Sequence, residues 1–126
     1  MAKPFTVSFD KDGHLVMVRV VGKASHEDHC SARDKAIQLC SDHQCSCLMV
    51  DLRDLDTEKS STLSCLTFGQ SMATVSQPLR FALVLPEDAK SAELVTFTSN
   101  VIANRGKTTK EFRSIEEAER WLTRRY

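Results

Sequence analysis

Leu48-Met49-Val50-Asp51-Leu52 is the stretch that decides the fold of this chain. It is too short for a helix and apolar almost throughout, which is typical of a strand that is covered on both faces. Phe81-Ala82-Leu83-Val84-Leu85 repeats this pattern and is ended by Pro86. Because a helix-length segment separates the two strands, the sequence indicates an α/β domain in which helices pack on a central sheet.

The residues before this stretch predict a hairpin and a first helix. Residues 5–9 alternate apolar and polar side chains, and residues 10–13 have the Asp-Gly chemistry of a tight turn. Residues 14–21 are rich in β-branched side chains and form the second expected strand. Ser25 opens a helix, and Asp28 stands where the acidic partner of a capping box belongs.

The residues after it predict two more helices and an edge strand. Asp88 is the expected cap of a helix that ends near Gly106. Residues 110–113 form a short polar edge strand, and Ser114 caps the last helix. We therefore expect a single domain over residues 1–126, with a mixed sheet of about five strands and about four helices largely on one face.

A stretch without any charged residue lies between Lys59 and Arg80. We expect a helix over residues 61–76, stopped by Pro78. Because a helix that is rich in hydroxyls but carries no charge is not expected to turn a whole side to water, this helix should contact another surface. Gly69 lowers helix stability by about 1 kcal/mol relative to Ala, which favours a tight contact there. That contact is with the rest of the domain, with a second copy of the chain or with an apolar ligand.

The charge balance excludes a binding mode that depends on a strong overall field. The chain has 17 Lys and Arg residues against 17 Asp and Glu residues, so no net charge gathers nucleic acid or an acidic membrane. Its five cysteines are irregularly spaced, and the N-terminal residues lack an apolar signal segment. No apolar run approaches the roughly 20 residues that cross a bilayer. We expect a cytoplasmic protein with reduced thiols and no transmembrane segment.

Histidines and cysteines gather in residues 26–30 and in residues 43–47. A structural metal needs four convergent ligands, commonly from Cys-x-x-Cys pairs, and the sequence has no such pair. We therefore expect no metal, no cofactor, and buried or incidental cysteines. The sequence also shows no convincing set of acid, base and nucleophile, which predicts that the protein is not an enzyme. A thiol-dependent activity at Cys30 or Cys65 is the enzymatic alternative.

Residues 51–62 carry a family resemblance. They begin with Asp51-Leu52 at the end of a strand and lead through Ser60-Ser61 into a helix. In this feature the chain resembles the STAS superfamily, the sulfate-transporter and anti-sigma-factor-antagonist domains. Members of that family carry an Asp-Ser-Ser-Gly motif at this place, and its first serine is the phosphoacceptor. Ser60-Ser61 matches the two serines, whereas Lys59 replaces the Asp and Thr62 replaces the Gly.

The C-terminal half is similar to the SpoIIAA-like branch of that superfamily, which is also called STAS/SEC14-like. The likeness is carried by Arg105-Gly106 and by residues 111–114 and 116–122. This resemblance implies a SpoIIAA-like fold and a non-catalytic regulatory module that acts through protein–protein interaction, as anti-sigma-factor antagonists do. It also implies an alternative, in which an apolar pocket between sheet and helices carries a small apolar or lipid-like ligand.

The expected site is the loop after the strand together with the uncharged helix. Ser60 and Ser61 are the candidate phosphoacceptors and switch residues, because the N–H groups at a helix N-terminus favour a phosphate. The alternative is that either serine only caps the helix. We expect the surface for a protein partner, a second copy in a homodimer or a ligand to be formed by Asp54, Asp56, Lys59, Leu63, Leu66, Phe68, Gly69 and Met72.

Overall fold

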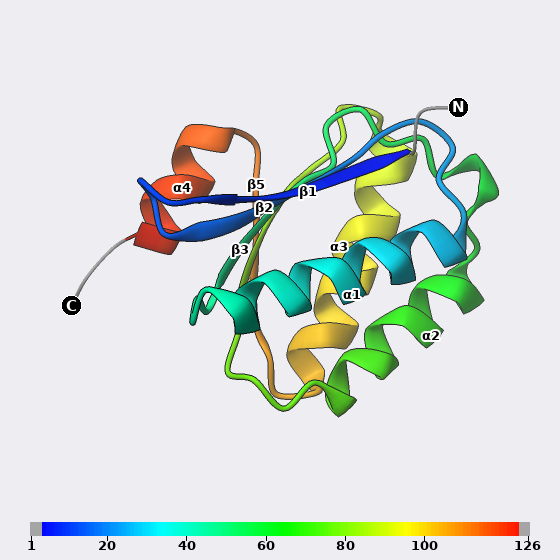
Figure 1. Ribbon diagram of the computed structural model, residues 1–126. Helices are drawn as coiled ribbons and strands as arrows, with labels where there is room; N and C mark the ends of the chain where they lie inside the picture. The colour runs from blue at the N-terminus through cyan, green and yellow to red at the C-terminus, as the bar shows by residue number, and fades with distance from the viewer. Residues whose placement is uncertain (1–3, 124–126) are drawn as a thin grey trace.

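The computed structural model describes residues 4–123 of the chain, and within them five strands form one sheet (Figure 1). The strands are β1 (Phe5–Asp10), β2 (Leu15–Val20), β3 (Cys47–Asp51), β4 (Arg80–Val84) and β5 (Thr108–Phe112). They lie side by side in the order β1-β2-β3-β4-β5. β1 and β2 form an antiparallel hairpin, and each later strand pairs in parallel with the one before it. The expected mixed sheet is confirmed.

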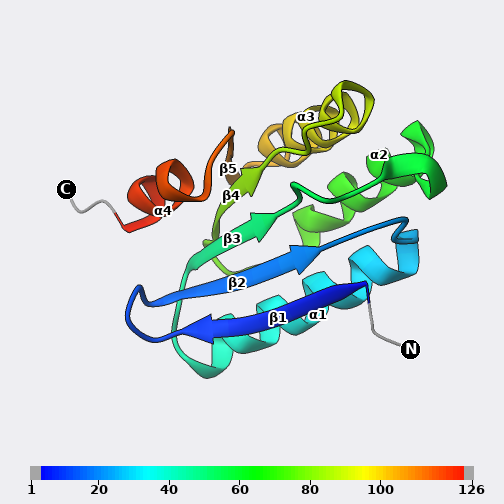
Figure 2. The ribbon, with the colours of Figure 1, turned by 90° about the horizontal axis from the view of Figure 1, so that it is seen from above.

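Both faces of this sheet are covered by helices. Within the described residues these are α1 (His26–Asp42), α2 (Thr62–Ser71), α3 (Ala89–Asn104) and α4 (Ile115–Thr123), and the short 3-10 helices η1 (Thr57–Lys59) and η2 (Met72–Thr74) flank α2. Figures 1 and 2 show α1, α2 and α3 on one face and α4 on the other. The prediction of helices largely on one face is confirmed. In this part of the chain no helix has both the length and the apolar character needed to cross a membrane.

Side-chain caps are present at the predicted starts of α1, α3 and α4. Ser25 and Asp28 bond to each other's backbone amides, at 2.8 Å from the Ser25 nitrogen and 3.1 Å from the Asp28 nitrogen. The Asp88 carboxylate accepts a hydrogen bond from the Ser91 amide at 2.9 Å. The Ser114 hydroxyl accepts one from the Glu117 amide at 3.2 Å. These predicted caps are confirmed, and each contributes about 1 kcal/mol to its helix.

α2 is shorter than the helix predicted over residues 61–76. It ends at Ser71, and η2 continues the turn to Thr74. The Ser71 hydroxyl donates to the Phe68 carbonyl at 2.6 Å and accepts a hydrogen bond from Arg33 of α1. A side chain that bonds its own backbone in this way competes with the regular helical pattern, so the helix changes form at this point.

Two further local differences arise from contacts that the sequence pattern does not contain. β5 spans Thr108–Phe112 instead of residues 110–113, because Thr108 pairs with Arg80 of β4. η1 was not expected, and it begins where the Asp56 carboxylate accepts from the Glu58 amide at 2.9 Å.

Alternation along β3 places its side chains on both faces of the sheet. Leu48 and Val50 face α1, α2 and α3, whereas Met49 packs with α4. This confirms that the strand is covered on both faces. Leu48 and Met49 are buried, but Val50 remains partly exposed although it belongs to the central strand. The incomplete burial of Val50 points to unfilled space under the three helices.

Candidate functional site

A cavity of about 130 Å³ lies between the sheet and the helices α1, α2 and α3. The strands contribute an aliphatic floor, and each of the three helices contributes part of the wall. Its apolar surface includes Val18, Ile37, Val50, Phe68, Leu83 and Ile102. Val50 is only partly buried because its side chain borders this space.

Small residues on α1 help to leave this space open. Ala32 and Ala36 both border the cavity, and both are buried. Residues four apart lie on the same face of a helix, so the two alanines form one strip that faces the sheet. Because both alanines line the cavity, longer side chains at these positions would extend into it.

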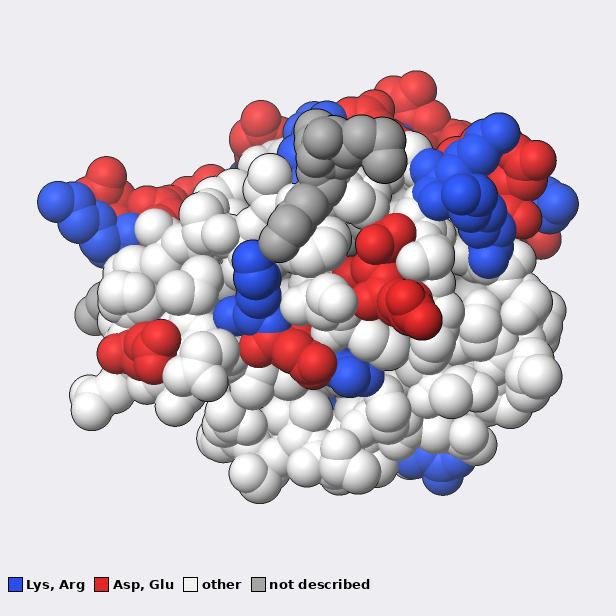
Figure 3. Space-filling view, turned by 45° about the vertical axis from the view of Figure 1, so that its right-hand side comes forward, with Lys and Arg blue, Asp and Glu red and all other residues white. Residues whose placement is uncertain are grey.

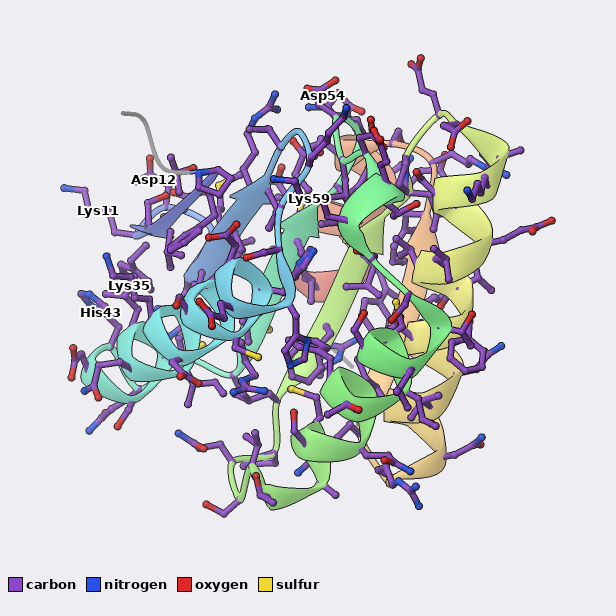
Figure 4. All side chains as sticks on the ribbon, turned by 90° about the vertical axis from the view of Figure 1, so that its right-hand side faces the viewer. Lys11, Asp12, Lys35, His43, Asp54 and Lys59 are labelled. Carbon is purple, nitrogen blue, oxygen red and sulfur yellow. The ribbon has the colours of Figure 1, made fainter. Side chains whose placement is uncertain are left out.

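α2 forms the roof of the cavity and packs more extensively on α3 than on α1. Gly69 is buried at the crossing of α2 and α3, where an added Cβ atom would lie 2.6 Å from Cγ1 of Val101. The tight contact at Gly69 is thus made within the domain. Figure 4 shows α2 beside α3, with side chains between α2 and α1.

Arg33 links α1 to this roof. Its Nη1 atom donates to Ser71 Oγ at 2.6 Å, and its guanidinium carbon lies 5.3 Å from the centre of the Phe68 ring. His29, one turn earlier in α1, also packs on Phe68, with a distance of 6.3 Å between ring centroids. These contacts join the two helices beside the cavity.

Imidazole and hydroxyl groups border the cavity near the carboxyl ends of β2 and β3, where ligands of open α/β sheets commonly bind. They belong to His26, His29, Thr57, Ser60 and Ser64. Burial lowers the pKa of His29 below its ordinary value of 6.5, Asp28 opposes this effect, and His26 adds to it. The His29 imidazole is therefore mainly neutral at neutral pH, and a neutral imidazole both donates and accepts hydrogen bonds.

Ser61 is the N-cap of α2. Its hydroxyl accepts from the Ser64 amide at 3.0 Å, and the Ser64 hydroxyl accepts from the Ser61 amide at 3.0 Å. Ser60 follows η1, donates its amide to the Thr57 carbonyl at 2.9 Å and borders the cavity. The structure shows the capping role for Ser61, and phosphorylation of either serine stays a prediction.

The loop that leads to these serines is anchored to the rest of the domain. The Gly22 amide donates to the Asp54 carbonyl at 2.9 Å, and the Asp56 amide donates to the Gly22 carbonyl at 2.9 Å. The buried hydroxyls of Thr57 and Ser91 bond at 3.0 Å, which ties η1 to α3. These contacts fix the place at which α2 begins.

Asp51 at the end of β3 belongs to a charge network at the sheet edge. Its Oδ1 atom accepts from Arg53 Nε at 3.0 Å, and its Oδ2 atom accepts from Arg19 Nη1 at 3.1 Å. Arg19 also pairs with Asp54. Burial raises the pKa of Asp51, but the hydrogen bonds and charge of Arg53, together with the charge of Arg19, lower it further than burial raises it. The ionised carboxylate holds the chain where β3 leads into the loop.

The residues predicted as a partner or ligand surface divide into outward and inward groups. Those of the loop and the first turn of α2 are exposed, namely Asp54, Asp56, Lys59 and Leu63, and Leu66 is partly buried. Those further along the helix turn inward: Phe68 and Met72 border the cavity, and the buried Gly69 contacts α3. Figure 4 shows Asp54 and Lys59 on the loop that precedes α2. One helix therefore has an uncharged outer side and a cavity-lining inner side.

The histidines and cysteines of residues 43–47 are used in packing. His43 stacks on Phe9 with ring centroids 3.8 Å apart, and the Cys45 thiol donates to the His14 carbonyl at 3.2 Å. Burial raises the pKa of the nearby Cys40 thiol to about 12, so it stays protonated. In the part of the chain that is described, no three His, Cys, Asp or Glu side chains converge so that they could hold a metal ion.

The thiols of the enzymatic alternative lie near the cavity. The Cys30 Sγ atom is 3.5 Å from His26 Nε2, and Cys65 borders the cavity from α2. An activated thiol needs a base that is itself oriented by a third group. Among residues 4–123 the hydrogen bonds show such a third group for neither thiol, and a thiol-dependent activity stays an untested alternative.

His29 and Arg33 are site residues that the sequence reasoning missed. Together with Ala36 they recur at positions i, i+4 and i+7, which is the spacing of one helix face. That spacing was the available signal, because it places an imidazole and a guanidinium beside a strip of small residues.

Comparisons with known proteins assign no family to the chain. No protein-family model matches the chain, and no curated protein sequence matches it either. The features of the molecule that bear on its function are therefore structural: the cavity, its polar border and the two sides of α2.

Proposed function

We propose that the protein is a non-catalytic binding module that holds a small apolar molecule in the cavity under α2. The cavity itself carries this proposal, because its volume is about 130 Å³ and its lining is largely aliphatic and aromatic. An engineered apolar cavity of about 150 Å³ in another protein stays dry and binds benzene. The present cavity is thus of the size that one small ring or a short aliphatic chain would fill.

A ligand of this size gains limited binding energy. The best small ligands gain about 1.5 kcal/mol per non-hydrogen atom, and most gain much less. We expect dissociation constants of roughly 0.05 to 1 mM for one-ring compounds. A long acyl chain needs more space than the cavity offers and would require α2 to move, so a small molecule is better supported than a lipid.

Toluene is a suitable probe, and its binding can be followed by NMR titration. Ala36→Leu fills the cavity and should abolish binding, whereas Ala103→Leu makes the same change at an exposed position of α3 and should leave binding unchanged. Because a leucine at position 36 could overpack the core, Val50→Ile supplies a milder filling that should weaken binding. The proposal is rejected if the wild-type protein does not bind toluene, or if binding survives both filled variants.

A second candidate function is a regulatory protein–protein contact through the outer side of α2. Leu63 is 71% exposed, and its neighbours Thr62, Thr67 and Gln70 are exposed and uncharged. Figure 3 shows a broad surface without charged residues on the right-hand side, between charged groups above and below it, and Figure 1 places α2 on that side of the molecule. The mixed sheet and the STAS-like resemblance agree with an anti-sigma-factor-antagonist-like role in the cytoplasm, with a protein partner or a second copy of the chain.

Self-association tests this second candidate directly. Leu63→Glu places a charge on the exposed leucine and should weaken a dimer in sedimentation equilibrium. Thr123→Glu adds the same charge at an exposed position of α4, on the other face of the sheet, and is the matched control. If the wild-type chain is monomeric, or if Leu63→Glu changes nothing, a homodimer through α2 is excluded.

A further inference from the structure

Most polar groups on the cavity wall already have hydrogen-bond partners. The Thr57 hydroxyl bonds to Ser91 at 3.0 Å, and the Ser64 hydroxyl donates to the Ser61 carbonyl at 3.0 Å. On α3, the Thr98 hydroxyl donates to a carbonyl of the preceding turn at 2.8 Å. These groups are satisfied within the domain and need no ligand.

The two histidines at the start of α1 differ from each other in their hydrogen bonding. His26 Nε2 lies 3.5 Å from the Cys30 thiol. The His29 ring has a ring contact with Phe68, but no described residue forms a hydrogen bond with either of its nitrogens. The same holds, within residues 4–123, for the hydroxyl of Ser60 and the weakly polar thiol of Cys65. His29 is therefore the strongest hydrogen-bonding group that the cavity offers to a bound molecule.

Charge on the wall is already neutralised. Among the described lining residues Arg33 is the charged one, and its Nε atom pairs with Asp34 at 3.1 Å while its Nη1 atom donates to Ser71. A ligand cation would lie beside a neutral imidazole with this guanidinium nearby. A ligand anion would have to take Arg33 from its present partners. Burying either charge without a partner is costly, so the wall favours an uncharged ligand.

We infer that the cavity takes an uncharged, ring-sized molecule with one hydrogen-bonding group, of the phenol class, and that His29 binds that group. The inference rests on the proposed function and names its ligand class. The ring of such a molecule would lie against Val18, Val50 and Leu83, and its hydroxyl would point toward the amino end of α1. A neutral imidazole can accept a hydrogen bond from the hydroxyl group or donate one to its oxygen.

A comparison of p-cresol with toluene tests this inference, because the two probes differ only in a hydroxyl group. The wild-type protein should bind p-cresol about fivefold more tightly, as expected for one neutral hydrogen bond. His29→Leu should bind the two probes about equally, because it removes the imidazole that distinguishes them. His29→Gln retains a donor and an acceptor and should keep most of the preference for p-cresol. His43→Leu makes the same change at the far end of α1 and should behave as wild type.

The outcomes separate the inference from the function on which it rests. If the wild-type protein binds neither probe, the proposed function fails and the inference fails with it. If it binds toluene but shows no preference for p-cresol, or if His29→Leu keeps the preference, the inference is overturned and the binding function stands. Tighter binding of benzoate or benzylamine than of p-cresol would overturn the assignment of an uncharged ligand. Circular dichroism of each variant establishes that the comparison is made on folded protein.

Discussion

A Cβ atom at Gly69 would lie 2.6 Å from Cγ1 and 2.8 Å from Cβ of Val101, closer than real Cβ atoms approach other atoms. The Val101 atoms that it would meet are next to the backbone, so they cannot swing away as the end of a long side chain would. The contact therefore fixes how closely α2 lies on α3, and through α2 it fixes the roof of the cavity.

Gly69→Ala should lower the free energy of unfolding by about 1–3 kcal/mol, although alanine is the better helix former by about 1 kcal/mol. The overlap with Val101 outweighs the gain in helix propensity. Urea denaturation measures the effect. Thr67→Ala, at an exposed position of the same helix, should change stability by less than about 0.5 kcal/mol. Val101→Ala should make room, so the double variant should be more stable than the sum of the two single effects predicts. A Gly69→Ala protein as stable as wild type would contradict this account.

Arg33→Met should loosen the roof of the cavity. Methionine keeps much of the side-chain length that packs on Phe68 but removes the hydrogen bond to Ser71, at a cost of about 1 kcal/mol. Amide hydrogen exchange should speed up more in α2 than in α3, because the contact between α1 and α2 would then lack its hydrogen bond and keep only the packing on Phe68. Arg120→Met, at an exposed position of α4, is the matched control. Equal exchange rates in α2 before and after the change would show that Arg33 does not hold the roof.

The fold was largely predictable because its signals are local. The apolar runs of β3 and β4 and the caps at Ser25, Asp88 and Ser114 each lie within a few residues of the element that they define. The end of α2 was not predictable in this way. It depends on Ser71, whose hydroxyl meets Arg33 from a helix 38 residues earlier in the chain.

The candidate site was predictable only in part. The uncharged stretch drew attention to α2, but a composition without charge does not tell an outer side from an inner one. Leu63 and Phe68 both read as apolar contact residues, yet Leu63 is 71% exposed and Phe68 borders the cavity. The cavity itself depends on how far α1 stands from the sheet above Ala32 and Ala36, and a one-dimensional pattern does not contain that distance.

His29 should make the stability of the protein depend on pH near neutrality. Burial lowers its pKa in the folded state below the ordinary value of 6.5, so the unfolded chain binds the proton more readily. Stability should therefore be full above about pH 7, fall as the pH drops through the unfolded pKa, and level off below the folded pKa. His29→Gln should flatten this part of the curve in urea midpoints measured between about pH 7 and about pH 5. Asp28 and Asp51, whose pKa values are lowered, act at more acidic pH and should leave this window unaffected. A His29→Gln curve as steep as that of wild type would rule out His29 as the source.

Ser61→Ala should destabilise the protein by about 1 kcal/mol, because it removes the cap of α2. Ser60→Ala should cost less than about 0.5 kcal/mol, since the observed bond of Ser60 to Thr57 is made by its backbone amide and survives the change. Thermal unfolding of the two variants separates these roles. Equal losses at both positions would mean that the cap is shared.

Ser60→Asp should couple a phosphate-like charge to the cavity, because Ser60 borders it together with His29. A carboxylate at this position would favour the imidazolium form, so the pKa of His29 should rise, as NMR titration of the ring can measure. Toluene should bind more weakly, since a charge would stand at the border of an apolar space. Ser61→Asp is the matched control, because Ser61 is exposed and an aspartate can still cap α2. If both variants bind toluene as wild type does and associate as wild type does in sedimentation, neither serine is a switch for the ligand or for a second copy of the chain.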